Sequence, residues 1–461
     1  MGGVIEIPVW LAVVAGVLGL AGLIDRIVGP GMRWLLRRRV ERAVDRLNER
    51  LQLRIQPFKL ARRRVLVDRL TYDPQVMAAM EAHAEETGEP RRVALERVER
   101  YARETVPAFS AFAYFKVGAR GARWLSRSLY DVRVGRWDEA QAEAVGPDAA
   151  VVFVMNHRSN MDYVLVTHLA ARRSALSYAV GEWARVWPLA PLIRAMGAYF
   201  IERRSRGPLY RKVLARYVQM AIEGGVTQAV FPEGGLSRDG RLREPKLGLI
   251  SYMVDGYRKG RSREVVFVPV GLAYDRVLED RILTRAKAEG PEARFRGQKR
   301  AALLFGLRLF WNRLTGRWGR FGHAAVGFGE PLRLSDWVEG DEPVDIEALG
   351  AELMRRVGEE VPVLPVPLAC AALLDGEARD EAALGADMAA RAARLEAAGA
   401  HVQPVEGKPV AAALAILRRR RLVEEADGRI RMKPDEREVF AFYAASIEHL
   451  GEGVEREAAA G

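Results

Sequence analysis

A series of short apolar segments through the middle of the chain constrains its fold more than any other feature. Residues 151–155 read Val-Val-Phe-Val-Met, a run of apolar and β-branched side chains typical of a buried strand. Similar runs recur at 175–180, 198–201, 228–231 and 265–271. The intervals between them leave room for helices, and such alternation is typical of an α/β domain. We therefore predict a central, largely parallel sheet flanked by helices between residues 130 and 335.

The regions on either side of this domain show a helical pattern. Residues 31–129 are basic, polar and punctuated by prolines, and they predict a helical N-terminal region. Residues 336–461 predict a mainly helical C-terminal region with a small hairpin, because Asp427-Gly428 separates two short strand-like runs. One α/β domain is therefore expected between two helical regions.

The first 30 residues are expected to form a membrane anchor helix. Residues 7–24 are uncharged and just long enough to span a bilayer. Residues 1–6 carry an acid and no Lys or Arg, which argues against a cleaved signal peptide. Six arginines between Arg33 and Arg46 follow, so the positive-inside rule places the catalytic domain in the cytoplasm, on the cell (inner) membrane. A buried or interfacial helix is the alternative, and whether the segment spans the bilayer or lies flat stays open.

The net charge of +12 requires an anionic partner: nucleic acid, an anionic membrane or a phosphorylated substrate. The cations crowd the stretch after the apolar segment and the polar loops described below, with only one short run in the tail. That distribution favours a bilayer with anionic lipids and a phosphorylated substrate, and no nucleic acid. The single cysteine, Cys370, excludes an intramolecular disulfide and lies in an apolar stretch, so a cysteine acyl-enzyme is not expected.

The loop after the first predicted strand carries the candidate catalytic base. It reads Asn156-His157-Arg158-Ser159-Asn160-Met161-Asp162. His157 is the only histidine in such a strand-end loop, which makes it the best general base, and Asp162 is placed to orient its imidazole. Residues five apart on a helix differ by roughly 140°, so the pair meets only if His157 precedes the first helical turn. A pair that merely caps and packs this junction is the alternative.

The second polar block runs from Gly197 to Arg204, just beyond another predicted strand. Arg203 and Arg204 offer bidentate donors for a phosphate group. The alternative is an ordinary solvated run of charges.

The third and fourth blocks follow the next two predicted strands. In Glu233-Gly234-Gly235 the glycines allow the backbone to approach a ligand closely, although an ordinary turn explains this pattern equally well. Ser237 and Arg238 add two more phosphate donors. The fourth block, 268–275, contains Pro269, a residue more typical of an edge or terminal strand than of catalysis.

Several other chemistries are excluded by their missing motifs. The Gly-rich stretch 235–241 lacks the Lys and Ser/Thr of a phosphate-binding Walker loop. The chain has no G-x-S-x-G elbow for a serine hydrolase and no His/Cys cluster with zinc spacing. No metal or organic cofactor is therefore implied.

The four blocks, taken in order, resemble the ordered motifs of the glycerolipid acyltransferases, which acylate glycerol-3-phosphate and lysophosphatidate. The similarity spans residues 156–275. Three details are closer to the glycerol-3-phosphate branch: His157 to Tyr163, the double glycine followed by Ser237 to Gly240, and Pro245 to Gly248. The tail from Arg421 to Leu450 is also similar to that branch.

The resemblance implies a role for each matching residue. His157 would deprotonate the sn-1 hydroxyl for direct attack on an acyl thioester, with Asp162 supporting it. Arg203 would hold the substrate phosphate, and Glu233, Gly234 and Pro269 match the cores of the third and fourth motifs. Leu236 stands where many members of the family have arginine, so we name Arg238 as the substitute. The full set of predicted substrate-binding residues is Arg158, Ser159, Gly197, Arg203, Arg204, Glu233, Gly234, Gly235, Ser237, Arg238 and Pro269.

The sequence thus predicts a membrane-bound O-acyltransferase that acylates glycerol-3-phosphate from acyl-CoA or acyl-ACP, as co-substrates and without a cofactor. Lysophosphatidate or another lysophospholipid remains open as the acceptor, because both branches share the base and the phosphate clamp. A non-catalytic basic protein that binds membranes or nucleic acid is the remote alternative.

Overall fold

The computed structural model describes residues 55–451 apart from 136–144, 147, 171–174, 182–188, 202–206, 289–318 and 340–341. The predicted anchor helix of residues 1–30 lies outside the described residues. Among those that are described, no helix combines the length and apolar character needed to cross a bilayer.

The first described region, residues 55–129, is helical. Its elements are α2 (Pro57–Leu60), α3 (Arg63–Thr71), α4 (Pro74–Thr87), α5 (Arg91–Thr105), the π-helix η1 (Ala113–Gly118) and α6 (Ala119–Leu129). The limits of α4 follow from its sequence. The Asp73 side chain caps the first turn by accepting from the Gln75 amide, and Gly88 ends the helix in the left-handed conformation, at φ 68°.

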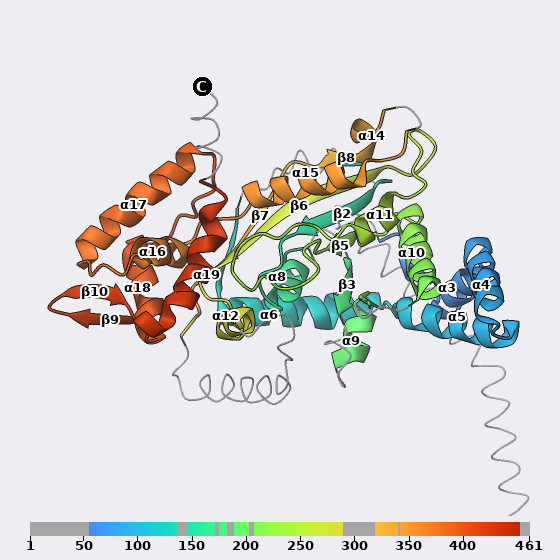
Figure 1. The fold of residues 1–461 in the computed structure, drawn as a ribbon, viewed down its shortest axis with the longest axis horizontal. Coiled ribbons are helices and arrows are strands. Elements are labelled where there is room, and N and C mark those ends of the chain that lie inside the picture. The colour runs from blue at the N-terminus through green and yellow to red at the C-terminus, as the bar shows by residue number, and fades with distance from the viewer. Residues whose placement is uncertain are drawn as a thin grey trace, which may run out of the picture. The chain divides into compact units, whose positions relative to one another are not determined.

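An eight-stranded sheet forms the centre of the described chain (Figure 1). Its strands are β1 (Asp131–Val134), β2 (Ala150–Met155), β3 (Ser177–Gly181), β4 (Tyr199–Ile201), β5 (Gln228–Val230), β6 (Val265–Tyr274), β7 (His323–Phe328) and β8 (Leu332–Arg333). The order is β1-β7-β6-β2-β5-β3-β4, with β8 beside β6. The pairs from β6 through β4 are parallel, whereas β7 and β8 run antiparallel to β6. The expected largely parallel sheet is confirmed.

The central strands are apolar throughout because helices cover both faces of the sheet. Every residue of β2 and β6 is buried. Figure 1 shows α15 (Ile346–Glu359) on one face and α8 (Met161–Ala170) with α6 on the other. The remaining helices between the strands are α9 (Leu189–Ala195), α10 (Pro208–Glu223), α11 (Gly248–Val254), α12 (Asp280–Ala288) and α14 (Leu334–Trp337). One apolar core joins β2 and β6 to α10, α15 and the N-terminal helices.

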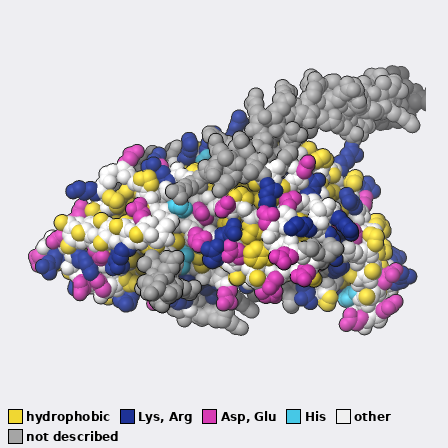
Figure 2. Space-filling model, turned by 90° about the horizontal axis from the view of Figure 1, so that it is seen from above, with side chains coloured by type: hydrophobic (Ala, Val, Ile, Leu, Met, Phe, Trp, Pro, Cys, Tyr) yellow, Lys and Arg dark blue, Asp and Glu magenta, His cyan; other side chains and the backbone are white. Residues whose placement is uncertain are grey.

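Among the described residues beyond 360, the C-terminal region contains four α-helices and the expected hairpin. The elements are α16 (Pro365–Leu373), α17 (Glu381–Ala397), α18 (Pro409–Arg419), β9 (Val423–Ala426), β10 (Arg429–Met432), the 3₁₀-helix η3 (Pro434–Glu436) and α19 (Arg437–Glu448). Asp427 and Gly428 both have positive φ, as the tight turn between β9 and β10 requires. Helix α19 packs against α16 within the region and against α12 of the α/β domain. On the face shown in Figure 2, positive and negative side chains are intermingled.

Candidate active site

The His157–Asp162 pair forms at the junction between β2 and α8. Strand β2 ends at Met155 and α8 begins at Met161, so His157 precedes the first helical turn. Its Nδ1 lies 2.8 Å from Asp162 Oδ2, and both side chains are buried, with 3% and 0% of their surface exposed. This is the folded-back arrangement that the sequence requires for the pair to meet.

Asp162 is held by four hydrogen bonds that also fix the loop. Its Oδ2 accepts from the backbone amides of Arg158 (2.7 Å) and Ser159 (3.0 Å) as well as from His157 Nδ1. Its Oδ1 accepts from the Tyr274 hydroxyl at 2.7 Å. The two backbone amides can only donate, so Oδ2 is an acceptor and the proton between it and His157 is assigned to Nδ1, which leaves Nε2 as the basic nitrogen.

Aromatic rings enclose the imidazole of His157. The ring of Phe231 stacks on it with centroids 4.3 Å apart, and Tyr163 meets it edge-on at 5.5 Å. These contacts restrict the imidazole to one orientation and keep its surroundings apolar. A fixed base in an apolar environment is suited to proton transfer.

The third block, which begins at Glu233, is hydrogen-bonded to the loop 156–162. Glu233 is buried, and its Oε1 accepts from the His157 amide at 2.9 Å. Burial raises the pKa of Glu233, whereas the nearby Arg158 lowers it. The Ser237 amide donates to the His157 carbonyl at 3.0 Å, and the Ser237 hydroxyl bonds within its own turn to Asp239 and to the Arg241 carbonyl.

The double glycine follows Glu233 in a turn. Gly234 has φ +66°, and a Cβ there would lie 2.5 Å from the Cδ of Lys246. A side chain at this position therefore meets both backbone strain and a close neighbour. Gly235 is partly exposed in the same turn.

Two arginines of the predicted substrate-binding set, Arg158 and Arg238, donate to backbone carbonyls in the structure. Arg158 is only 3% exposed, and its Nη1 donates to the carbonyl of Gly240 and, at 3.3 Å, to that of Arg241. Burial lowers the pKa of the Arg158 guanidinium. The Nη1 of Arg238 donates to the Ala286 carbonyl at 3.4 Å. Arg203 and Arg204 lie outside the described residues.

Gly197 and Pro269 lie in the scaffold around the loop. Gly197, at φ +92°, turns the chain between α9 and β4, where a Cβ would approach the side chains of Phe109 and Lys59. Pro269 lies within β6, opposite Val154 of β2, and its carbonyl accepts from the Gly329 amide. It is an interior residue of the central sheet and not an edge-strand residue.

Two residues of the loop's support were missed from the sequence. Tyr274, at the end of β6, donates to Asp162. Glu279 accepts from the Ser159 hydroxyl at 2.7 Å through Oε2, and from the Asn160 backbone and side-chain amides at 3.3 and 3.1 Å through Oε1. Burial raises the pKa of Glu279, and the bonds from Ser159 and Asn160 oppose that shift. Tyr274 lay in the fourth block without a visible partner, and Glu279 lay outside every motif.

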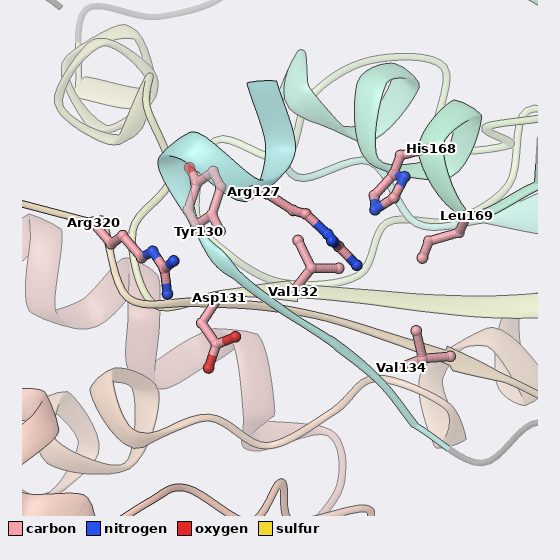
Figure 3. A pocket seen from close by; sticks show the side chains of 8 residues that line it. All are labelled: Arg127, Tyr130, Asp131, Val132, Val134, His168, Leu169 and Arg320. Atoms are coloured by element: carbon pink, nitrogen blue, oxygen red, sulfur yellow. The ribbon is translucent and has the colours of Figure 1, made fainter. Parts of the chain in front are cut away.

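A cavity of about 490 Å³ opens near this site, lined by Arg127, Tyr130, Asp131, Val132, Val134, His168, Leu169 and Arg320. Figure 3 shows Arg127 reaching it from α6 and Arg320 from the segment before β7. The Tyr130 ring lies 5.4 Å from that of Tyr274, which itself bonds Asp162. The cavity is thus separated from the catalytic pair by two aromatic side chains. Within the described residues, no cluster of three or more His, Cys, Asp or Glu side chains is placed to hold a metal.

Comparison with known proteins finds two family models that match parts of this chain. Residues 136–273 match the Acyltransferase family, and residues 312–450 match the glycerol-3-phosphate acyltransferase C-terminal region. The predicted relationship to glycerolipid acyltransferases is confirmed. The loop 156–162 lies within the residues that match the Acyltransferase family, and α16 to α19 lie within those that match the glycerol-3-phosphate acyltransferase C-terminal region.

Curated relatives are named glycerol-3-phosphate acyltransferase. Glycerol-3-phosphate acyltransferase of Pseudomonas putida is 29% identical over 350 residues, which are 70% of this chain and 40% of that protein. The enzyme of the same name from Aeromonas hydrophila is 29% identical over 347 residues, 71% of this chain and 42% of that protein. The chain thus spans about two fifths of the length of these relatives. A crystal structure of a 1-acyl-sn-glycerophosphate acyltransferase from Thermotoga maritima aligns at a TM-score of 0.32 and 19% identity, covering 64% of this chain and 95% of that one.

Proposed function

We propose that this protein transfers a fatty acyl group from an acyl thioester to the sn-1 hydroxyl of glycerol-3-phosphate, giving lysophosphatidate. The observation that carries the proposal is the buried contact between His157 Nδ1 and Asp162 Oδ2, which leaves Nε2 as a base. The C-terminal region shared with the glycerol-3-phosphate branch favours that acceptor.

The reaction needs one base that later returns its proton. His157 Nε2 takes the proton of the sn-1 hydroxyl as its oxygen attacks the thioester carbonyl, and a C–O bond forms. Asp162 stabilises the resulting imidazolium. Collapse of the tetrahedral intermediate breaks the C–S bond, and the departing thiolate takes the proton from His157. No acyl-enzyme is required, which fits Cys370, whose thiol is fully buried and has its pKa raised by that burial.

The acceptor's phosphate needs cationic donors beside the base. Arg203 and Arg204 of the second block remain the proposed clamp, with Arg238 of the third block as a further donor. Arg158 is buried, and its Nη1 donates to backbone carbonyls. The cavity lined by Arg127 and Arg320 is suited to the phosphates of the acyl donor. Acyl-CoA and acyl-ACP both remain possible donors, because each presents a phosphorylated pantetheine thioester.

The enzyme would work on the cytoplasmic side of the cell membrane. The uncharged run 7–24 and the arginines after it support an anchor in a bilayer with anionic lipids. The surface of α6 agrees with this location, because Trp124 is 58% exposed between the exposed cations Arg120, Arg123 and Arg127.

The test is acyl transfer by membranes that contain wild-type protein or the His157→Ala variant. Glycerol-3-phosphate and lysophosphatidate are offered in parallel, each with acyl-CoA and with acyl-ACP. Transfer to glycerol-3-phosphate that disappears in the variant is expected. Transfer to lysophosphatidate alone would move the enzyme to the second acylation step, and transfer to neither by folded protein would refute the proposal.

A further inference from the structure

The short segment 274–280 contacts the catalytic loop on one side and the C-terminal region on the other. On the loop side Tyr274 donates to Asp162, and Glu279 accepts from Ser159 and Asn160. These bonds reach the carboxylate that orients the base and the turn that follows it. The segment therefore helps to fix the position of the loop 156–162.

On the other side the segment is held by the Asp280 cluster, defined as Asp280, Arg420 and Tyr443. Asp280 Oδ2 accepts from the Tyr443 hydroxyl at 2.6 Å and from Arg420 Nη2 at 2.5 Å. The same hydroxyl accepts from the Val277 amide at 2.9 Å and from Arg420 Nη1 at 3.2 Å. Tyr443 belongs to α19, and Arg420 follows α18. Two elements of the C-terminal region thus converge on residues 277–280.

The cluster is buried and charged, which sets it apart from ordinary packing between regions. Asp280, Arg420 and Tyr443 are all nearly inaccessible, with side-chain exposures of 5% and 7% for the ion pair and 1% for the tyrosine. Burying an ion pair costs desolvation that apolar side chains would not incur. Its directional bonds instead fix where α12 begins, and Asp280 is adjacent to Glu279.

Helix α19 reaches the catalytic loop by a second contact. The Gly240 carbonyl accepts from the buried Arg158 guanidinium, and a Cβ on Gly240 would lie 1.8 Å from the Phe442 carbonyl oxygen. Phe442 and Tyr443 are neighbours on α19. One helix of the C-terminal region therefore supports the loop 156–162 from both sides, through residues 277–280 and through residue 240.

We propose that the C-terminal region positions the catalytic base, with Tyr443 and the Asp280 cluster acting through Glu279 on the loop 156–162. Tyr443 and Glu279 are positioning residues, because neither is placed among the reacting groups. The inference rests on the proposed acyl transfer for its kinetic readout, and it assigns the C-terminal region a part in catalysis beyond covering the α/β domain.

The experiment compares Tyr443→Phe, Glu279→Gln and the double variant in the full-length protein. Each change is nearly isosteric and removes polar contacts without leaving a cavity. Leu384→Ala is the control, because Leu384 is fully buried in α17 of the C-terminal region and lies outside the Asp280 cluster. It destabilises the region by truncating its core. All four are assayed well below their unfolding temperatures.

We expect each single variant to lower kcat by about three- to tenfold, with KM for glycerol-3-phosphate changed by less than about twofold, because misplaced catalytic groups affect the chemical step. The double variant is expected to be no slower than Glu279→Gln alone, since both substitutions break one path. Leu384→Ala is expected to lower the unfolding temperature and leave kcat unchanged. The proposal is overturned if Tyr443→Phe keeps the wild-type kcat, or if the losses of the two single variants multiply in the double variant. It is also overturned if Leu384→Ala loses as much kcat as Tyr443→Phe.

A second readout does not depend on activity. Hydrogen exchange of the peptide covering 156–163 should accelerate in Tyr443→Phe and stay at the wild-type rate in Leu384→Ala, because only the former releases the loop amides. Unchanged exchange in Tyr443→Phe would overturn the coupling even if the protein acylates another acceptor. An inactive wild type with accelerated exchange in the variant would refute the proposed function and uphold the coupling.

Discussion

Replacing Asp162 by Asn separates the charge of this carboxylate from its hydrogen bonds. Asp162 accepts three N–H bonds at Oδ2 and the Tyr274 hydroxyl at Oδ1. An asparagine whose oxygen takes the place of Oδ2 keeps all three N–H bonds. Its amide then faces the Tyr274 oxygen, which accepts once the hydroxyl hydrogen turns away. The variant is therefore expected to fold.

The cost to stability is small compared with the cost to catalysis. Bonds to a charged acceptor contribute about 1 kcal/mol more than neutral ones, and relief of a buried charge offsets part of that loss, so we expect a net destabilisation of about 1–2 kcal/mol. The neutral amide, however, no longer stabilises the imidazolium of His157. The same replacement in a Ser-His-Asp triad lowers kcat about 10⁴-fold through the wrong histidine tautomer, which the retained Nδ1–H bond avoids here, so we expect a smaller loss of about 10²- to 10³-fold.

The assay is kcat for glycerol-3-phosphate acylation, with urea unfolding of the same preparations. Tyr274→Phe is the matched control, because it removes one bond from the same carboxylate and leaves the charge in place. Its kcat should fall by no more than about tenfold. A loss below tenfold in Asp162→Asn, or equal losses in the two variants, would refute the assignment of Asp162 as the electrostatic partner of the base.

Three further predictions concern stability. His449→Gln should make the free energy of unfolding, measured in urea, less sensitive to acid. Burial lowers the pKa of His449 to about 4, so the unfolded chain takes up the proton first as the pH drops. The wild-type free energy of unfolding therefore falls between about pH 6.5 and 4, by up to about 1.4 kcal/mol per pH unit. His323→Asn should show the opposite pH dependence, because the hydrogen bond to Asp275 raises the pKa of His323. The wild type should exceed the variant in free energy of unfolding most clearly below about pH 6.5, and the difference should shrink as the pH rises through the raised pKa. A difference that grows with pH would contradict this prediction. Gly240→Ala should destabilise by at least about 2 kcal/mol more than Gly376→Ala in chemical denaturation. The two glycines have nearly equal φ values, +85° and +86°, but only at Gly240 would the new Cβ clash with a backbone oxygen, that of Phe442. Equal losses would assign the whole effect to backbone strain.

Local patterns in the sequence predicted the elements of the fold well. The apolar run at 151–155 became β2, and Asp427-Gly428 became the turn of the hairpin, because strand and turn preferences act over a few residues. The antiparallel pairing of β7 and β8 with β6 could not be predicted in this way. This pairing depends on which strands meet across long stretches of chain. The local sequence pattern of residues 323–333 does not specify the partner strand or its direction.

The sequence also determined the chemistry that the site offers: a histidine and a carboxylate at a strand-to-helix junction, glycines in the third block and arginines beside it. Only the tertiary structure decided how these groups are used. Arg158 was predicted only to bind substrate, and the structure shows it buried with Nη1 on the Gly240 carbonyl. Glu279 matched no motif, yet it accepts from Ser159 and Asn160. Hydrogen bonds between residues more than eighty positions apart exist only once the sheet has brought their loops to one edge. For that reason the sequence predicts the base, and only the folded chain shows which residues hold that histidine in place.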